Sequence, residues 1–281
     1  MNLISPKKKF NKNLVKTDSI LPFREKNDLF EGYFNGFSVI ITNKNDVKEL
    51  VEKGCFGKPE FSRAVSNHDP ECVILRKRQF EYRKKYPIGK DLKKIIIVPD
   101  SESDDDYFTD LKPFYDFDKS LFSNNSLILS LHEAYFLAVE LKCLKIANVE
   151  NPWDEFKNIN QYFIIDYAVY LHFRLKNWVI KSGLKFGCDF LLYKQGPAFY
   201  HASYVVIIDV INEKLDRILN LQRRSMEYKN LIGLYRLAET TGKELLICQV
   251  ILPENVNLTS CDCLNCLCVN EVLFRRFIPS N

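Results

Sequence analysis

Three side chains with complementary acid–base chemistry lie beside strand-like apolar runs in the C-terminal part of the chain. Tyr193 and His201 lie in the run LLYKQGPAFYHASYVVIIDV, and Lys243 follows in RLAETTGKELLICQV. Cleavage of RNA without a metal needs a base for the ribose 2′-OH, an acid for the departing 5′-oxygen and a fixed positive charge at the crowded phosphate. A phenol, an imidazole and an ammonium suit these tasks, so the three residues are candidate catalytic groups.

Each of the three has a distinct expected role. An unperturbed Tyr has a pKa of about 10 and becomes a useful base only where a nearby cation favours its anion. Lys243 is expected to supply that charge to Tyr193 and to stabilise the pentacoordinate phosphate. His201 is expected to hold a proton for the leaving oxygen. The 2′-OH would then attack its own phosphate and leave a 2′,3′-cyclic phosphate and a 5′-OH, a reaction that DNA cannot undergo.

Length and composition indicate a globular protein with two modest domains. The chain has 281 residues, which is enough for two cores. Hydrophobic residues make up 46% and aromatic residues 13%, a composition that excludes general disorder. The net charge of +4 is too small to establish nucleic-acid binding, because the distribution of charge matters more than its total. That distribution is uneven, since PKKKF and RKRQFEYRKK are basic and DSESDDD at 100–106 is acidic.

Cysteine usage and hydropathy bear on the cellular compartment. The nine Cys are odd in number and several are scattered singly, which favours free thiols in a reducing compartment. The basic N-terminus lacks the apolar run of a secretory signal, and no stretch approaches the length of a transmembrane helix. An intracellular protein without membrane contact is therefore expected. PKKKF is either a nuclear-import signal or a solvated tail, and the nucleus is the expected location.

The first part of the chain predicts a disordered basic tail followed by short strands and a helix. Residues 1–24 are polar and basic, and we expect them to be poorly ordered. The run at 29–42 alternates aromatic and β-branched residues around turn formers, which predicts a hairpin. Next, Asn45 or Asp46 is expected to cap a short helix that Gly54 ends.

The N-terminal domain is expected to be a mixed α/β domain at 25–159. It should contain a further strand at 93–99 and an acidic loop at about 100–125, which has too few apolar residues to pack. Ser130 and Glu133 have the spacing of a capping box. This pair predicts an amphipathic helix of about a dozen residues after Ser130.

The C-terminal domain, at 160–281, is expected to be a nuclease domain with a mostly antiparallel sheet and flanking helices. It opens with the helical pattern FIIDYAVYLHFRLKNW, and its expected strands are WVIKSG, FGCDFLLY, SYVVIIDV, ELLICQVIL and EVLFRRFI. A basic helical segment at 220–241 separates the third strand from the fourth, and its RRSMEYK part is expected to form a solvated face. The predicted fold class is therefore α+β, with the mixed N-terminal domain packed on the C-terminal domain.

Several long motifs resemble those of the tRNA-splicing endonucleases and occur in the same order. The motifs are LVEKGCFGKPEFSR, SLHEAYFL, YLHFRLKNWVIKSGLKFGCDFLLYKQGPAFYHASYVV, RLAETTGKELL and EVLFRRF. They span most of residues 30–280, with the acidic segment as the main exception. The KGCFGK block and the YKQGPAFYH spacing are most similar to the eukaryotic catalytic subunit that cuts the 5′ splice site. The resemblance implies a tRNA-intron endonuclease of the RNA-lyase type that needs no metal and no cofactor.

The resemblance also implies roles for single residues. Tyr193 falls on the family's general base, His201 on its general acid and Lys243 on its charge stabiliser. Family members hold an extruded bulge base between an Arg and an aromatic ring, and these positions fall on Arg236 and Phe277. The family more often has Trp at the second position, and Phe is a weaker cation–π partner. The implied partners are pre-tRNA and, in a heterotetramer, a second catalytic subunit and two structural subunits.

Other interpretations stay open at this point. The chain could be a catalytically silent scaffold or an RNA-binding subunit of the same assembly, although the full trio disfavours both. A metal-dependent nuclease built on Asp189, Glu227 and Lys229 is disfavoured because Glu227 lies in a helix-like segment. The Cys residues of CDCLNCLC lack the longer spacing of ordinary zinc sites, which favours a Cys-rich surface loop.

Overall fold

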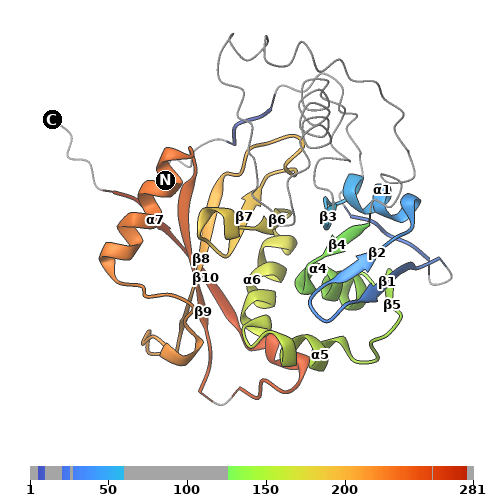
Figure 1. The fold of residues 1–281 in the computed structure, drawn as a ribbon. Helices are drawn as coiled ribbons and strands as arrows, with labels where there is room; N and C mark the ends of the chain where they lie inside the picture. The colour runs from blue at the N-terminus through green and yellow to red at the C-terminus, as the bar shows by residue number, and fades with distance from the viewer. Residues whose placement is uncertain (1–5, 10–20, 26–27, 60–125, 255, 277–281) are drawn as a thin grey trace, which may run out of the picture. The chain divides into compact units, whose positions relative to one another are not determined.

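The computed structural model describes residues 6–9, 21–25, 28–59, 126–254 and 256–276. The chain forms two compact units, one made of Met1–Lys58 with Ser126–Asn281 and one of Pro59–Asn125. The second unit lies almost wholly outside the described residues, and so do the expected strand at 93–99 and the acidic loop. The first unit holds two five-stranded sheets (Figure 1). No helix in the described ranges is long and apolar enough to cross a membrane.

The N-terminal sheet has the strand order β3-β4-β2-β1-β5. Its strands are β1 (Phe30–Phe34), β2 (Val39–Ile41), β3 (Lys58–Pro59), β4 (Leu127–Leu129) and β5 (Leu144–Ile146). β1 and β2 form an antiparallel hairpin in which Tyr33 opposes Ile40, which confirms the predicted hairpin. Buried and exposed positions alternate along β1, as they do in a strand with one face on a core.

The first helix, α1 (Lys44–Glu52), begins earlier than predicted. Its N-cap is Asn43, and not Asn45 or Asp46, because the Asn43 side chain accepts a hydrogen bond from the Asn45 backbone N–H. Asp46 instead lies buried in the first turn, where its carboxylate pairs with Arg24 at 2.9 Å. A carboxylate in this turn also complements the helix dipole.

The second helical segment begins at the predicted capping box, and both reciprocal hydrogen bonds of Ser130 and Glu133 are present. The box opens α4 (Leu131–Tyr135), which continues as the π-helical turn η2 (Phe136–Glu140). Together they account for most of the predicted length. The switch to π-helical geometry was not predicted, since apolar spacing does not distinguish a π-helical turn from an α-helical one.

The Glu133 carboxylate also fastens the turn before β3 to the C-terminal sheet. Its Oε1 accepts hydrogen bonds from the Gly57 backbone N–H at 3.0 Å and from Lys181 Nζ at 2.9 Å. Lys181 Nζ also donates to the Gly57 carbonyl at 2.8 Å. Burial alone would raise the pKa of Glu133, but Lys181, the Ser130 N–H and Arg174 hold it below its ordinary value. The charged pair therefore stabilises the fold near neutral pH.

Glu133→Gln should lower the free energy of unfolding by about 1–3 kcal/mol at pH 7, because Lys181 loses a charged partner in a buried site. A depressed carboxyl pKa gives stability that is present above the unfolded-state pKa and lost as the pH falls through the folded-state pKa. The deficit of the variant should therefore shrink only as the pH falls from the unfolded-state value of about 4.3 through the lower folded-state pKa of Glu133, where the wild-type carboxyl takes up a proton. Urea unfolding at about pH 7 and about pH 2.5 measures it, and an equal deficit at both would contradict this interpretation.

The C-terminal sheet has the order β10-β9-β8-β7-β6. Its strands are β6 (Val179–Ser182), β7 (Phe190–Tyr193), β8 (Tyr204–Ile211), β9 (Glu244–Ile251) and β10 (Cys268–Phe274). The β8–β9 pair is parallel and the other pairs are antiparallel, so the sheet is mostly antiparallel, as predicted. α7 (Tyr228–Thr240) connects β8 to β9, because parallel strands need a crossover connection.

Helices cover both faces of the C-terminal sheet (Figure 1). α6 (Phe163–Leu175) lies on one face and α7 on the other, while α5 (Pro152–Ile159) precedes α6 and packs against it and α4. Along β8, Val206 and Ile208 belong to the core cluster that includes residues of α6. Val205 and Ile207 belong to a second cluster that includes Leu231 of α7. Every position of β8 is buried, which explains why its sequence is a nearly continuous apolar run.

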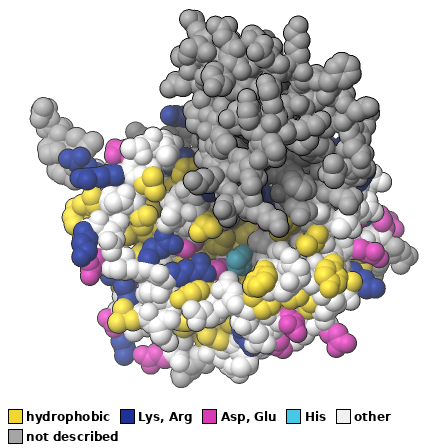
Figure 2. Space-filling view, in the orientation of Figure 1, with side chains coloured by type: hydrophobic (Ala, Val, Ile, Leu, Met, Phe, Trp, Pro, Cys, Tyr) yellow, Lys and Arg dark blue, Asp and Glu magenta, His cyan; other side chains and the backbone are white. Residues whose placement is uncertain are grey.

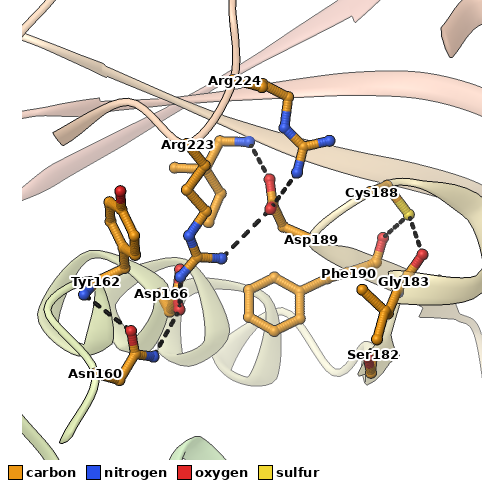
Figure 3. Close-up of polar contacts among 12 residues, drawn as sticks. Asn160, Tyr162, Asp166, Ser182, Gly183, Cys188, Asp189, Phe190, Arg223 and Arg224 are labelled. Atoms are coloured by element: carbon orange, nitrogen blue, oxygen red, sulfur yellow. Dashed lines mark hydrogen bonds and ion pairs between the residues drawn. The ribbon is translucent and has the colours of Figure 1, made fainter. Parts of the chain in front are cut away.

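The prediction of a solvated helix face at RRSMEYK holds for Tyr228 and Lys229, which are exposed at the start of α7, and is wrong for the two Arg residues. α7 begins only at Tyr228, after both of them. Arg224 pairs with the buried Asp189 at 2.5 Å, and Arg223 pairs with the buried Asp166 of α6. Figure 3 shows the two guanidinium groups directed at these carboxylates. The segment before α7 is therefore tied by ion pairs to α6 and to the start of β7.

Candidate active site

The backbone of Tyr193, His201 and Lys243 lies at one end of three adjacent strands. Tyr193 is the last residue of β7, His201 shortly precedes β8, and Lys243 directly precedes β9. The antiparallel β7–β8 pair ends with the Ser203 N–H donating to the Leu192 carbonyl at 2.8 Å. The parallel β8–β9 pair begins with the Glu244 N–H donating to the Ser203 carbonyl at 3.0 Å. Sheet pairing therefore brings the three predicted residues to a common strand end.

Tyr193 is half-buried and packs against the cluster between the sheet and α7. Burial raises the pKa of its phenol, and the Cys188 thiol raises this pKa further. The prediction that Lys243 lowers the pKa of Tyr193 is therefore wrong for the unbound protein. The phenol is protonated at neutral pH until something changes its surroundings.

Lys243 is engaged elsewhere in the unbound protein, which explains this difference. Its Nζ donates to the Thr241 carbonyl at 3.0 Å and lies 4.4 Å from the centroid of the Phe186 ring. Burial lowers the pKa of Lys243, and Cys188 opposes that shift. Burial also raises the pKa of the Cys188 thiol to about 12, so this thiol is uncharged at neutral pH.

His201 is exposed at the end of the loop that joins β7 to β8. The loop turns at Gly196, which has φ +100 and whose carbonyl accepts the Tyr200 N–H at 3.1 Å. A Cβ at Gly196 would lie 2.4 Å from the Cys55 Sγ, so the loop packs directly on the KGCFGK block. On its other side the His201 N–H donates to the Lys7 carbonyl at 3.0 Å. The imidazole is thus open to solvent on a loop whose backbone is held from both sides.

Of the two residues predicted to hold an extruded base of the RNA bulge, the structure describes only Arg236. Arg236 is exposed on α7, and no hydrogen bond or ion pair to another described residue engages it. Phe277 lies outside the described residues. Phe274, at the end of β10, packs edge-on against Tyr235 with ring centroids 6.0 Å apart. This contact brings the end of β10 next to the helix turn that carries Arg236.

Several residues around the strand end were not singled out in the sequence. Cys188 and Phe186 lie in the turn before β7, and Glu244 is buried directly after Lys243. The Glu244 carboxylate accepts from Arg275 Nε at 2.8 Å. An acidic residue at the start of an otherwise apolar strand was the available signal for Glu244. Nothing in the sequence marked Phe186 as the ring beneath Lys243.

The side chains that the structure describes do not support the alternative based on a metal ion. Within the described residues, no group of three or more His, Cys, Asp or Glu side chains could hold a metal ion. Asp189 is already engaged by Arg224, Arg223 and the Ile208 N–H. Glu227 is the N-terminal neighbour of α7 and pairs with Lys229, so it does not face Asp189 from an adjacent strand.

The fold and the strand-end site define the class to which the chain belongs. The chain is a member of the tRNA intron endonuclease family. The model of the family's N-terminal domain matches residues 30–154, and the model of its catalytic C-terminal domain matches residues 163–258. The second match contains Tyr193, His201 and Lys243.

Among individual proteins the chain is similar to Sen2 subunits of tRNA-splicing endonuclease. It is 39% identical to the subunit from Rattus norvegicus over 163 residues, which is 55% of this chain and 35% of that protein. It is 34% identical to Sen2-1 of Arabidopsis thaliana over 54% of this chain and 64% of that protein. It is 26% identical to the probable subunit of Schizosaccharomyces pombe over 77% of this chain and 73% of that protein. The match thus spans about a third of the rat relative and most of the fission-yeast one.

Proposed function

We propose that the chain is a catalytic subunit of a tRNA-splicing endonuclease that cuts pre-tRNA at the 5′ splice site. The proposed reaction is attack of the 2′-OH on the adjacent phosphate without a metal, which leaves a 2′,3′-cyclic phosphate and a 5′-OH. One observation carries the proposal: the pairing of β7, β8 and β9 brings the backbone of Tyr193, His201 and Lys243 to the same strand end. Their side chains supply the base, the acid and the fixed charge of the reaction.

The proposed roles account for the raised pKa of the phenol. Tyr193 is the base, but its phenol is protonated in the unbound protein because it is buried beside Cys188. The Lys243 ammonium contacts the Thr241 carbonyl and the Phe186 ring. A phosphate can replace these two contacts with a stronger, charge-assisted hydrogen bond. Bound RNA would draw Lys243 toward the scissile phosphate and the phenol, where its charge favours the phenolate. His201, exposed on its loop, is the acid for the 5′-oxygen.

Substrate and partner contacts extend the proposal. Arg236 and Phe277 would hold an extruded base of the pre-tRNA by stacking. Figure 2 shows Lys and Arg side chains spread among hydrophobic and acidic ones on the side of the molecule where α7 lies, and exposed cations of this kind suit phosphate contacts. Among the described strands β10 pairs with β9 alone, so its free edge suits pairing with another subunit. The proposed assembly is a nuclear heterotetramer with a second catalytic subunit and two structural subunits.

A substrate with one altered sugar tests the reaction. The purified complex that contains this chain should cut intron-containing pre-tRNA in EDTA. A 2′-deoxynucleotide 5′ to the 5′ splice site should abolish that cut and leave cleavage at the other site intact. End-group analysis should show a 2′,3′-cyclic phosphate. Cleavage of the deoxy substrate, or a requirement for added metal, would overturn the proposed chemistry.

Subunit-specific inactivation tests the alternative of a silent scaffold or RNA-binding subunit. A complex with Tyr193→Phe in this chain should lose the 5′ cut and keep the 3′ cut. If both cuts persisted at the wild-type rate, the chain would bind or position RNA without cleaving it.

A further inference from the structure

The basic segment near the N-terminus pairs with the loop that carries His201. Lys8 forms an antiparallel bridge with Tyr200. The Lys9 N–H donates to the Phe199 carbonyl at 2.7 Å, and the His201 N–H donates to the Lys7 carbonyl at 3.0 Å. The expected disorder of the tail at 1–24 therefore does not hold for residues 6–9, nor for residues 21–24, where Arg24 pairs with Asp46. A backbone bridge of this kind fixes the position of the residue proposed as the acid.

The side chains of Lys7, Lys8 and Lys9 alternate between the two sides of the N-terminal segment. Successive side chains of an extended chain point to opposite sides, so Lys7 and Lys9 share one side and Lys8 takes the other. Lys9 Nζ donates to the Pro197 carbonyl at 2.7 Å, which anchors the segment to the loop. Lys7 Nζ lies 3.6 Å from where a Cβ of Gly242 would be. Lys7 therefore reaches the turn that directly precedes Lys243.

The ammonium of Lys7 has no acidic partner among the described residues. Two carboxylates flank the turn that it reaches, and both are engaged by other groups. Glu239 accepts from the Tyr235 hydroxyl at 3.2 Å, and Glu244 accepts from Arg275 Nε at 2.8 Å. Lys7 itself is exposed. An exposed cation whose backbone is held next to the turn before Lys243 lacks the counter-charge that an anionic ligand would supply.

We propose that Lys7 is a substrate-positioning residue that binds a phosphate of the RNA next to the scissile one. The inference rests on the proposed function of the strand-end site. Lys243 would act on the reacting phosphate, and Lys7 on a neighbouring phosphate of the same strand. The backbone bridge holds both Lys7 and His201 in register with that strand. The contact is electrostatic and independent of sequence, because it is made to the RNA backbone.

The test compares two neighbouring lysines in the assembled complex. Lys7→Gln should reduce kcat/KM for pre-tRNA about three- to tenfold and reduce the slope of log kcat/KM against log salt by about one. Lys7→Arg should restore both values, because it keeps the charge. Lys8→Gln removes the same charge from the opposite side of the segment and should change neither. A Lys7→Gln complex with the wild-type kcat/KM and salt slope would overturn the inference. A Lys7→Gln complex that cleaved faster than wild type would also overturn it, and would indicate that the N-terminal segment blocks the site.

Two further measurements distinguish the role of Lys7 from the support of His201 by the backbone bridge and from the proposed cleavage reaction. Lys9→Pro removes the N–H that bonds Phe199 and should lower kcat, because His201 loses its support, whereas Lys7→Gln should act mainly on KM. Equilibrium binding of labelled pre-tRNA to each complex, followed by fluorescence anisotropy across salt concentrations, needs no cleavage. If the wild-type complex bound but did not cut, the proposed function would fail, and the Lys7→Gln binding slope would still decide the role of Lys7.

Discussion

His201→Ala should slow cleavage at the 5′ splice site by roughly 10²–10⁴-fold, the usual contribution of a general acid. The imidazole is exposed at the end of the β7–β8 loop, where it can reach a leaving oxygen without any rearrangement of the core. Affinity for pre-tRNA should change little, because phosphate contacts spread over a large surface hold the tRNA body. Single-turnover cleavage and binding of the same substrate measure the two effects separately.

A substrate with a 5′-bridging sulfur at the scissile phosphate distinguishes lost chemistry from a displaced loop. A thiolate leaves without a proton, so this substrate should restore cleavage by His201→Ala. It should not restore Tyr193→Phe, whose defect lies in activation of the 2′-OH. His172→Ala is the matched control, because His172 lies on α6 and pairs with Glu271 at 2.8 Å, and it should stay within a few-fold of wild type. Equal rescue of both variants, or of neither, would refute the assignment of acid and base.

The elements that position the site could be predicted because local signals coincide with them. The β-branched run of β8 and the capping box at Ser130 each mark one element without reference to the rest of the chain. Sheet pairing then brings the ends of β7, β8 and β9 together. The trio was recognised by residue type, and its position at a common strand end follows from that pairing.

The parts that could not be predicted depend on tertiary contacts. Lys243 was expected to act on Tyr193, but its ammonium lies over Phe186, and only the fold brings those two residues together. The bridge between Lys8 and Tyr200 joins segments from opposite parts of the chain, so a basic tail gave no sign of it. Arg224 was expected to lie on a solvated helix face, yet it bonds a buried carboxylate.

Arg224→Leu should lower the free energy of unfolding by about 3–5 kcal/mol, because it leaves a buried carboxylate without its main partner. The Asp189 side chain is 4% exposed, and Arg224 Nη2 approaches it to 2.5 Å. Burial raises the pKa of Asp189 even with Arg224, the Ile208 N–H and Arg223 opposing the shift. Lys229→Leu is the control, since Lys229 pairs with Glu227 in an exposed position and should cost less than about 0.5 kcal/mol. Urea unfolding of the three proteins measures the differences.

The change in unfolding free energy caused by a second substitution, Asp189→Asn, tests whether the buried charge destabilises Arg224→Leu. Asp189→Asn should destabilise the wild type, because Arg224 loses its partner. It should stabilise Arg224→Leu, because the amide keeps an acceptor for the Ile208 N–H and removes a buried charge that Arg223 alone, at 3.4 Å, balances less well. The deficit of Arg224→Leu should also narrow as the pH falls from 8 to 5. Loss of the guanidinium raises the pKa of Asp189 further, so the folded state gains stability as the carboxyl takes up a proton. If Asp189→Asn destabilised both backgrounds equally and the deficit were independent of pH, the effect would come from lost packing of the Arg224 side chain and not from its charge.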